Sequence, residues 1–264
     1  MSTSALAAPP AVLSFAASDP TGGAGLQADL LTLAALGCHP LSVVTALTVQ
    51  DTSGVARMQA VESSFVAQQA RQLLADIAVA AFKAGVLGSA QNMRAVSEVL
   101  GHHGAQPFVL DPVLASGRGD ALADADAIAA LRTLLLPRTT VLTPNSIEAR
   151  RLAQPASELA ECAQRLLDYG CQYVLITGTH EARAEVVNTL YDARGVVRED
   201  RWPRLAGEYH GSGCTLASAI AARLAHGVPI EHAVREAQQF TWDALAAGFK
   251  AGRGQRLPNR FFRR

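Results

Sequence analysis

The sequence His210-Gly211-Ser212-Gly213-Cys214-Thr215 runs directly into LASAIAARLAHG, residues 216–227. Leu216, Ile220 and Leu224 recur at four-residue spacing with alanines between them, which predicts a largely buried helix. The two glycines of the turn permit backbone conformations and close approaches that a side chain would block. Such a turn can direct several free N–H groups at one anion, with the positive end of the helix dipole behind them. The stretch therefore predicts a helix start at which an anionic group is bound.

A thiol stands at the start of this helix, at Cys214. Because a helix N-terminus lowers the pKa of a thiol, we expect thiolate character there. The alternative is that the helix simply begins with a small buried residue, since cysteine is among the most often buried residue types. Glycine-rich turns before helices are also common, so this stretch alone leaves both interpretations open.

Apolar runs and helical patterns alternate along the rest of the chain. Strands are predicted at residues 11–17, 41–50, 54–61, 80–87, 107–114, 139–145 and 171–178, and helices at 26–36, 63–75 (with a Ser cap), 90–103, 124–135, 157–169 and 232–249. Segment 54–61 is expected at an edge, and segments 185–192 and 195–202 are expected to form an antiparallel pair. The alternation favours a largely parallel sheet covered by helices on both faces.

Polar residues interrupt the chain where these strands end, namely Asp19, Gln50, Asp111, Asn145 and Thr177. In parallel sheets ligands bind beyond the carboxyl ends of the strands, so their convergence would make a site. Asp111 either caps a loop or serves a divalent metal or a phosphate. Asp29, placed in the first turn of helix 26–36, either complements the helix dipole or contacts a ligand. The chain carries no Walker A motif and no G-x-G-x-x-G after a strand, so nucleotide phosphates would need another binding device.

Composition favours one domain over residues 1–264, with residues 1–10 as a flexible tail; the chain has 264 residues, 49% of them hydrophobic. The formal net charge is zero, so nothing suggests a nucleic-acid or membrane-surface partner. The four cysteines lack C-x-x-C spacing, which makes a disulfide framework implausible and a cytoplasmic location expected. The N-terminal residues lack the basic region of a signal peptide, and no apolar run reaches membrane-spanning length.

Six ordered motifs carry a resemblance to a known family: SDPTGGAGLQADL (18–30), SVVTALTVQDT (42–52), KAGVL (83–87), VLDPV (109–113), LTPNSIEA (142–149) and HGSGCTLASAIAA (210–222). Over roughly residues 11–248 the chain resembles the hydroxymethylpyrimidine/phosphomethylpyrimidine kinases of thiamine biosynthesis, within the ribokinase-like superfamily. The resemblance implies a three-layer α/β/α sandwich with a mostly parallel central sheet. It also implies a cytoplasmic homodimer that uses ATP and Mg²⁺. Its substrates would be 4-amino-5-hydroxymethyl-2-methylpyrimidine and the monophosphate of that ring.

The resemblance assigns roles to particular residues. The N–H groups of Gly211, Ser212, Gly213 and Cys214 would form the anion hole, and Cys214 would be the base that takes the proton of the substrate hydroxymethyl group. The ring would be hydrogen-bonded by Asp29 and Gln50 and lined by Ala24, Val86 and Val113. Asp111 and Glu148, with Asn145, would lie near Mg²⁺ and the triphosphate, and Thr177 and Gly178 beside the nucleotide phosphates.

Two departures from the family pattern bear on activity. Thr177-Gly178-Thr179-His180 stands where the family usually has a Lys-Gly-Gly-His-like segment, which removes a positive charge near the phosphates. Val86 stands in place of a family methionine, which predicts a ring pocket that is either looser or shaped for a different ring substituent. Two alternatives therefore stay open beside the pyrimidine kinase: a pyridoxal/pyridoxine kinase of vitamin B6 salvage, which shares the Cys-containing turn, and a pyrimidine-binding sensor with weak turnover.

Overall fold

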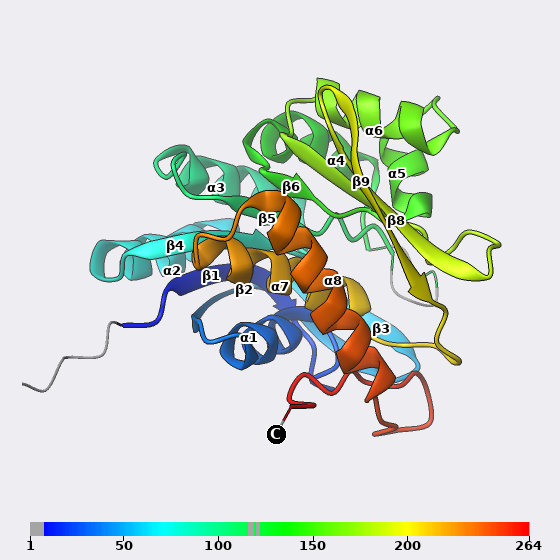
Figure 1. Cartoon of the computed structure of the whole chain (residues 1–264). Helices are drawn as coiled ribbons and strands as arrows, with labels where there is room; N and C mark the ends of the chain where they lie inside the picture. The colour runs from blue at the N-terminus through cyan, green and yellow to red at the C-terminus, as the bar shows by residue number, and fades with distance from the viewer. Residues whose placement is uncertain (1–7, 116–118, 120–121, 264) are drawn as a thin grey trace, which may run out of the picture.

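The computed structural model describes residues 8–115, 119 and 122–263. The tail expected over residues 1–10 therefore lies largely outside the described residues. Within the described ranges the chain winds around one nine-stranded sheet, with strand order β3-β2-β1-β4-β5-β6-β7-β8-β9 (Figure 1).

The central six strands of the sheet are parallel: β1 (Ala11–Ser18), β2 (His39–Asp51), β4 (Val79–Ala84), β5 (Phe108–Leu110), β6 (Val141–Leu142) and β7 (Tyr173–Thr177). Antiparallel strands close both edges, β3 (Gly54–Ala60) on one side and the pair β8 (Glu185–Asp192) and β9 (Gly195–Pro203) on the other. The predicted edge strand and the predicted antiparallel pair are both confirmed. All the carboxyl ends of the parallel strands meet at one edge of the sheet, where sequence analysis expects the site.

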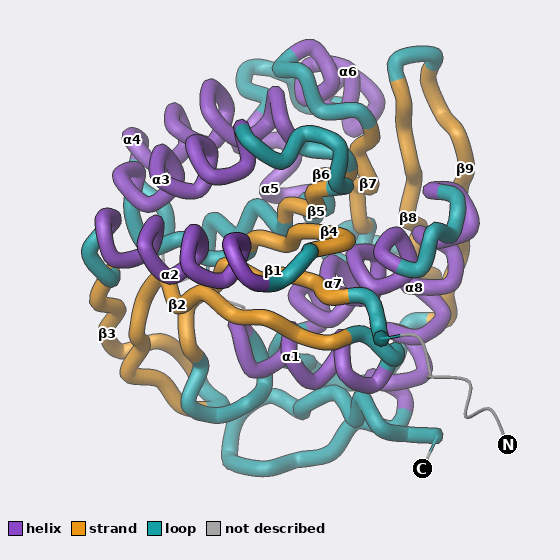
Figure 2. The backbone as a smooth tube through the Cα atoms, turned by 90° about the vertical axis from the view of Figure 1, so that its left-hand side faces the viewer, coloured by secondary structure: helices purple, strands orange, loops and turns teal. Residues whose placement is uncertain are grey.

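Helices cover both faces of the sheet (Figure 2). One layer consists of α1 (Gly25–Ala35), α7 (Ser212–Ala225) and α8 (Ile230–Ala246), and the other of α2 (Ser63–Asp76), α3 (Ala90–Gly101), α4 (Ala125–Ala130), α5 (Ser146–Leu152) and α6 (Leu159–Asp168). Alternate residues of β1 enter opposite cores: Val12 packs with α7 and α8, whereas Leu13 and Phe15 pack with the layer on the other face. This is the expected three-layer α/β/α fold with a mostly parallel sheet.

Helix α7 runs through the middle of its layer as a nearly apolar rod. Its residues from Thr215 to Ala222 are all buried, and the sequence prediction of a largely buried helix is confirmed. Alanine dominates this span, so the helix can lie close to the sheet and to α1. That close approach fixes the first turn of α7 at the carboxyl edge of the strands.

Two local expectations are wrong. The helix expected over 124–135 is α-helical only to Ala130; it continues as a π-helical turn over Leu131–Leu135 and a 3₁₀ turn over Leu136–Arg138, where Pro137 cannot donate a helical hydrogen bond. The expected serine cap of α2 is absent, because the cap position is Glu62 and the Ser64 hydroxyl donates to the Glu62 carboxylate instead. Within the described ranges, none of the helices combines the length and the apolarity needed to cross a membrane.

Candidate active site

Two glycine-rich turns meet at the carboxyl edge of the sheet. One connects β1 to α1 and contains Gly23; the other precedes α7 and contains Gly211. Gly211 is the N-cap residue of α7 with φ +80°, and a Cβ there would collide with the carbonyl oxygen of Gly23. Only glycine therefore lets the two backbones approach this closely.

The first turn of α7 presents the expected N–H groups. The N–H of Thr215 is bonded to the carbonyl of Gly211 at 3.0 Å, so Ser212, Gly213 and Cys214 precede the first helical hydrogen bond. Gly213 is exposed, and the position a Cβ would take there lies 3.6 Å from both carboxylate oxygens of Asp111. The first turn of α7, where the anion hole is predicted, thus lies directly beside the carboxylate predicted to bind the metal.

Cys214 lies in this first turn with its residue surface partly exposed. Burial of the thiol raises its pKa to about 12, the charge of Lys83 lowers it, and the carboxylates of Asp111 and Asp29 raise it further. The expectation of thiolate character in the unliganded protein is therefore wrong. The helix terminus is outweighed by desolvation and by two nearby carboxylates, which the sequence places far from Cys214 along the chain.

Asp29 lies in a buried ion pair. Its fully buried carboxylate pairs with Lys83 at 2.9 Å and accepts the hydroxyls of Ser14 at 2.5 Å and Ser218 at 2.8 Å. Because α1 begins at Gly25, Asp29 lies beyond the first turn, and the dipole-complementing placement is wrong. Its hydrogen bond to a substrate ring stays a prediction, and it requires one of these internal partners to give way.

Lys83 is the basic residue at the centre of the cluster. Burial alone would lower the pKa of its amine, but the charges of Asp29 and Asp111 raise it. The ammonium group is therefore charged and connects α1 to the carboxyl edge of the sheet. In the sequence Lys83 stands out only as part of the KAGVL motif. The signal that could identify it is a lysine inside an apolar strand, because a buried lysine needs a carboxylate partner.

Gln50 ends β2 beside the glycine turns. Its amide nitrogen lies 3.2 Å from Nε2 of His210, which lies 2.9 Å from a carboxylate oxygen of Asp19. Asp19 also accepts the N–H groups of Thr21 at 2.8 Å and Ala24 at 2.7 Å. Although burial raises the pKa of Asp19, the hydrogen bonds from His210 and from this turn hold it below its usual value. Gln50 and Ala24 are therefore brought to the same turn, and His210 is a site neighbour that the motif did not single out.

Asp111 and Glu148 form an acidic pair. Asp111 follows β5, is buried, and its Oδ2 has no hydrogen-bond partner. Burial raises the pKa of Asp111 to about 6, with Lys83 opposing. Burial, and then the charge of Asp111, raise the pKa of Glu148 to about 8. Two carboxyls that resist ionisation side by side, one of them with an oxygen that has no hydrogen-bond partner, fit a site completed by a cation.

Mg²⁺ is the cation whose requirements this pair meets. It binds proteins through one or two carboxylates and takes its other ligands from water and substrate phosphates. Among the described residues, no cluster of three or more His, Cys, Asp and Glu side chains could hold a metal by itself. The carboxylates present therefore fit a magnesium ion shared with a phosphate ligand, and not one enclosed by protein alone.

Asn145, Thr177 and Gly178 lie along the ends of β6 and β7. Asn145 caps α5: its side-chain oxygen accepts the N–H of Glu148 at 2.9 Å, and its own N–H donates to the Glu148 carboxylate at 2.9 Å. Asn145 and Thr177 form a parallel bridge, and the N–H of Gly178 donates to Asn188 at 3.1 Å. The capping box thus joins the predicted nucleotide residues to Glu148.

The loop after Gly178 lacks the family lysine but is framed by two arginines. Arg204 donates to the carbonyls of Thr179 at 2.8 Å and Glu181 at 3.0 Å. Arg150 pairs with the Glu181 carboxylate at 2.8 Å. Both guanidinium groups hold the loop itself, so neither replaces the missing lysine as an unengaged charge.

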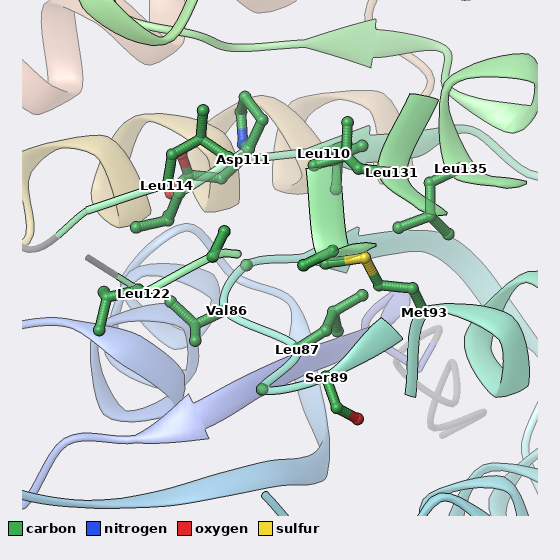
Figure 3. A pocket seen from close by; sticks show the side chains of 16 residues that line it. Val86, Leu87, Ser89, Met93, Leu110, Asp111, Leu114, Leu122, Leu131 and Leu135 are labelled. Carbon is green, nitrogen blue, oxygen red and sulfur yellow. The ribbon is translucent and has the colours of Figure 1, made fainter. Parts of the chain in front are cut away.

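Val86 and Val113 line a narrow, mostly apolar pocket between the ends of β4 and β5 and helices α3 and α4. Figure 3 shows Val86 and Leu87 facing Asp111 and Leu114 across it. The carbonyl of Val86 is fixed by the Thr45 hydroxyl at 2.7 Å. Asp111 lines the same pocket, so the structure brings these two valines to the acidic pair; Ala24 lies in the turn before α1 and does not line this pocket.

The chain is similar to known kinases in both sequence and structure. A sequence model of the family described as phosphomethylpyrimidine kinase matches residues 19–259. A hydroxymethylpyrimidine/phosphomethylpyrimidine kinase of Streptomyces coelicolor is 42% identical over 254 residues, 93% of this chain and 92% of that protein. The crystal structure of a phosphomethylpyrimidine kinase from Clostridium difficile has a TM-score of 0.78 and 31% identity, covering 89% of this chain and 99% of that one. The pyridoxal kinase of Staphylococcus aureus in complex with AMP-PCP and pyridoxal has a TM-score of 0.87 and 28% identity, covering 96% and 94%.

Proposed function

The chain belongs to the phosphomethylpyrimidine kinase family, and from this premise we propose that it transfers the γ-phosphoryl group of ATP to 4-amino-5-hydroxymethyl-2-methylpyrimidine and then to its monophosphate, in thiamine biosynthesis. The protein is a kinase. Relatives at 37–42% identity, which match about nine-tenths of the chain or more, are named hydroxymethylpyrimidine/phosphomethylpyrimidine kinase.

One observation supports the assignment most: the exposed Gly213 in the first turn of α7 lies beside the carboxylate of Asp111, whose Oδ2 has no hydrogen-bond partner. Phosphoryl transfer needs aligned positive charge around the transferring group more than it needs covalent chemistry. The N–H groups of Gly211, Ser212, Gly213 and Cys214 would supply that charge from one side. Asp111 and Glu148 would hold Mg²⁺ on the other, where it would screen the phosphate oxygens.

Cys214 is the group we assign as base for the substrate hydroxymethyl proton. Its thiol is protonated in the unliganded protein, since burial and then the nearby carboxylates set its pKa against the opposing charge of Lys83. Neutralising the Asp111 carboxylate removes one of the charges that raise this pKa. We infer that Cys214 acts as base only in the loaded site, where its lowered pKa lets the thiol first release its own proton to water. The resulting thiolate then takes the proton of the hydroxymethyl group late in the transfer, which agrees with a loose transition state.

The remaining assignments concern binding. Asp29 and Gln50 would hydrogen-bond the ring, and Ala24, Val86 and Val113 would line the ring pocket. Asn145, Thr177 and Gly178 would lie beside the nucleotide phosphates. Each of these residues keeps the role that the resemblance gives it, and the backbone bridge between Asn145 and Thr177 supports a shared phosphate-facing edge.

Three further points belong to the same proposal: a cytoplasmic location, a single domain over residues 1–264, and a homodimer. The homodimer is supported by exposed apolar side chains on the edge hairpin, where Leu47 and Val49 of β2 are 56% and 61% exposed. Adjacent exposed apolar side chains on one strand face could form part of a contiguous apolar patch, and such patches mark protein–protein interfaces.

A second candidate function is phosphorylation of pyridoxal. The observation that favours it is the fit to the pyridoxal-bound kinase of S. aureus, with a TM-score of 0.87. Sequence identity favours the pyrimidine, at 42% against 28%.

The test is ADP release by the purified protein with ATP and Mg²⁺, comparing the hydroxymethylpyrimidine, its monophosphate and pyridoxal. We expect turnover on both pyrimidines. Turnover on pyridoxal alone would overturn the thiamine assignment and leave the kinase assignment standing. Tight pyrimidine binding without ADP release would support the sensor instead.

A further inference from the structure

The C-terminal segment returns to the active-site edge after α8. The N–H of Asn259 donates to the carbonyl of Ala244 at 2.9 Å, and the ring of Phe262 packs on that of Phe240 with centroids 5.5 Å apart. Leu257 is buried against Gly23, where a Cβ would meet its side chain at 2.6 Å. The segment is therefore docked across the turn that precedes α1, and Arg260 lies at the centre of this contact.

Arg260 is only 4% exposed and reaches both glycine turns. Its Nη2 donates to the carbonyl of Gly23 at 2.6 Å, and its Nη1 lies 3.4 Å from the carbonyl of Gly22. Its Nε donates to the hydroxyl oxygen of Thr215 at 3.1 Å. One guanidinium group thus spans the turn before α1 and the first turn of α7.

The direction of these hydrogen bonds is fixed by the chemistry of the donor. A guanidinium has no acceptor, so the Thr215 oxygen must accept from Arg260 and its hydrogen is left to donate elsewhere. That hydrogen goes to the carbonyl of Gly211 at 2.8 Å. The result is a relay in which Arg260 bonds the carbonyl of Gly23 directly and orients the carbonyl of Gly211 through Thr215.

These two carbonyls belong to the residues that approach each other most closely at the site. Gly211 has no room for a Cβ because the Gly23 carbonyl occupies that space. Arg260 holds the Gly23 carbonyl of this contact directly and the Gly211 carbonyl through Thr215. The anion-hole N–H groups belong to Gly211 and to the three residues that follow it, so their direction depends on this contact.

We propose that Arg260 is a positioning residue for phosphoryl transfer, which holds the Gly22–Gly23 turn and the start of α7 in register. The expected effect on kcat rests on the proposed function. The expected effect on the position of the two turns rests on the hydrogen bonds alone. Lysine cannot replace it, because an ammonium is a compact point charge, whereas the planar guanidinium fork reaches three acceptors in fixed directions.

The experiment compares Arg260→Lys and Arg260→Ala with a control, Arg263→Met. Arg263 lies in the same segment and is exposed, with its guanidinium 5.3 Å from the Phe262 ring. A displacement of about 1 Å in a reacting group costs about 10²-fold in rate, so we expect Arg260→Lys to lose about 10- to 100-fold in kcat with less change in the KM for ATP. Guanidinium ion below denaturing concentration should restore part of the kcat of Arg260→Ala and leave Arg263→Met unchanged.

Backbone amide exchange gives a readout that does not depend on turnover. In Arg260→Lys, exchange should accelerate in peptides covering residues 19–25 and 210–216, and not in β4 or β5. Normal kcat in Arg260→Lys at a temperature where it is folded, or unchanged exchange in both peptides, would overturn the inference. Because the exchange result is independent of the ring substrate, failure of the thiamine assignment would not be confused with failure of this one.

Discussion

Asp111→Asn should make the unliganded protein more stable at neutral pH while it removes activity. The Asp111 carboxyl is buried, its Oδ2 is unpartnered, and burial raises its pKa from 3.8 to about 6. A raised carboxyl pKa means that the folded state binds the proton more tightly than the unfolded state does. Stability is therefore complete below about pH 4 and declines as pH rises to about 6.

The magnitude follows from that difference. Two pKa units at 1.36 kcal/mol each are worth about 3 kcal/mol, which the neutral amide would recover above pH 7. Glu148 adds to the gain, because the Asp111 charge helps to raise its pKa. Removing the carboxylate should also lower kcat by at least about 10²-fold, since the metal loses a ligand while the anion hole is unchanged.

Urea unfolding of both proteins at pH 4.5 and pH 7.5 measures this. We expect the Asp111→Asn variant to be more stable than wild type by about 2–3 kcal/mol at pH 7.5 and by much less at pH 4.5. Saturating Mg²⁺ with ATP should stabilise wild type and have a smaller effect on the variant. A variant that is less stable at pH 7.5, or one whose difference from wild type does not change with pH, would refute the reasoning.

Two other substitutions test the framework around the site. Lys83→Met should destabilise the fold by about 3–5 kcal/mol in chemical denaturation, because it leaves the Asp29 carboxylate buried without its 2.9 Å partner. Adding Asp29→Leu should recover part of that lost stability. A double variant as unstable as Lys83→Met would contradict the ion-pair account. Gly211→Ala should abolish turnover and strongly destabilise the fold, because its Cβ meets the Gly23 carbonyl. The control Gly227→Ala, also at positive φ but with nothing within 4 Å of the added Cβ, should cost only about 1–2 kcal/mol of stability. Equal effects of the two substitutions in thermal unfolding would show that Gly211 provides a backbone conformation and not the close approach.

The sheet and its helices could be predicted from sequence because each strand is a short apolar run bounded by a turn, and each helix has a regular apolar period. Polar strand ends such as Asp111 and Asn145 could be placed at one edge, because parallel strands share their carboxyl end. Strand order could not be predicted. The irregular continuation after Ala130 was also missed, since it depends on Pro137 and on packing against neighbouring helices.

The features that could not be predicted depend on charged groups that come together only in the folded chain. Burial is the largest cause of the raised pKa of Cys214, and the charged groups that also act on it are distant in sequence. Asp111 is more than a hundred residues away from Cys214, and Lys83 and Asp29 are further still. A rule that uses only the local helix start therefore gives the wrong direction. The buried position of Arg260 could likewise not be predicted, because the basic composition of the C-terminal segment indicates nothing about burial.

The most direct test of the account is identification of the product formed by wild type and by Cys214→Ala from the hydroxymethylpyrimidine, ATP and Mg²⁺, with phosphorus NMR and mass spectrometry. We expect wild type to form the pyrimidine monophosphate and then the diphosphate, and Cys214→Ala to form them at least about 10²-fold more slowly. Normal rates in Cys214→Ala would contradict its assignment as base. Absence of any phosphorylated pyrimidine from wild type would contradict the function itself.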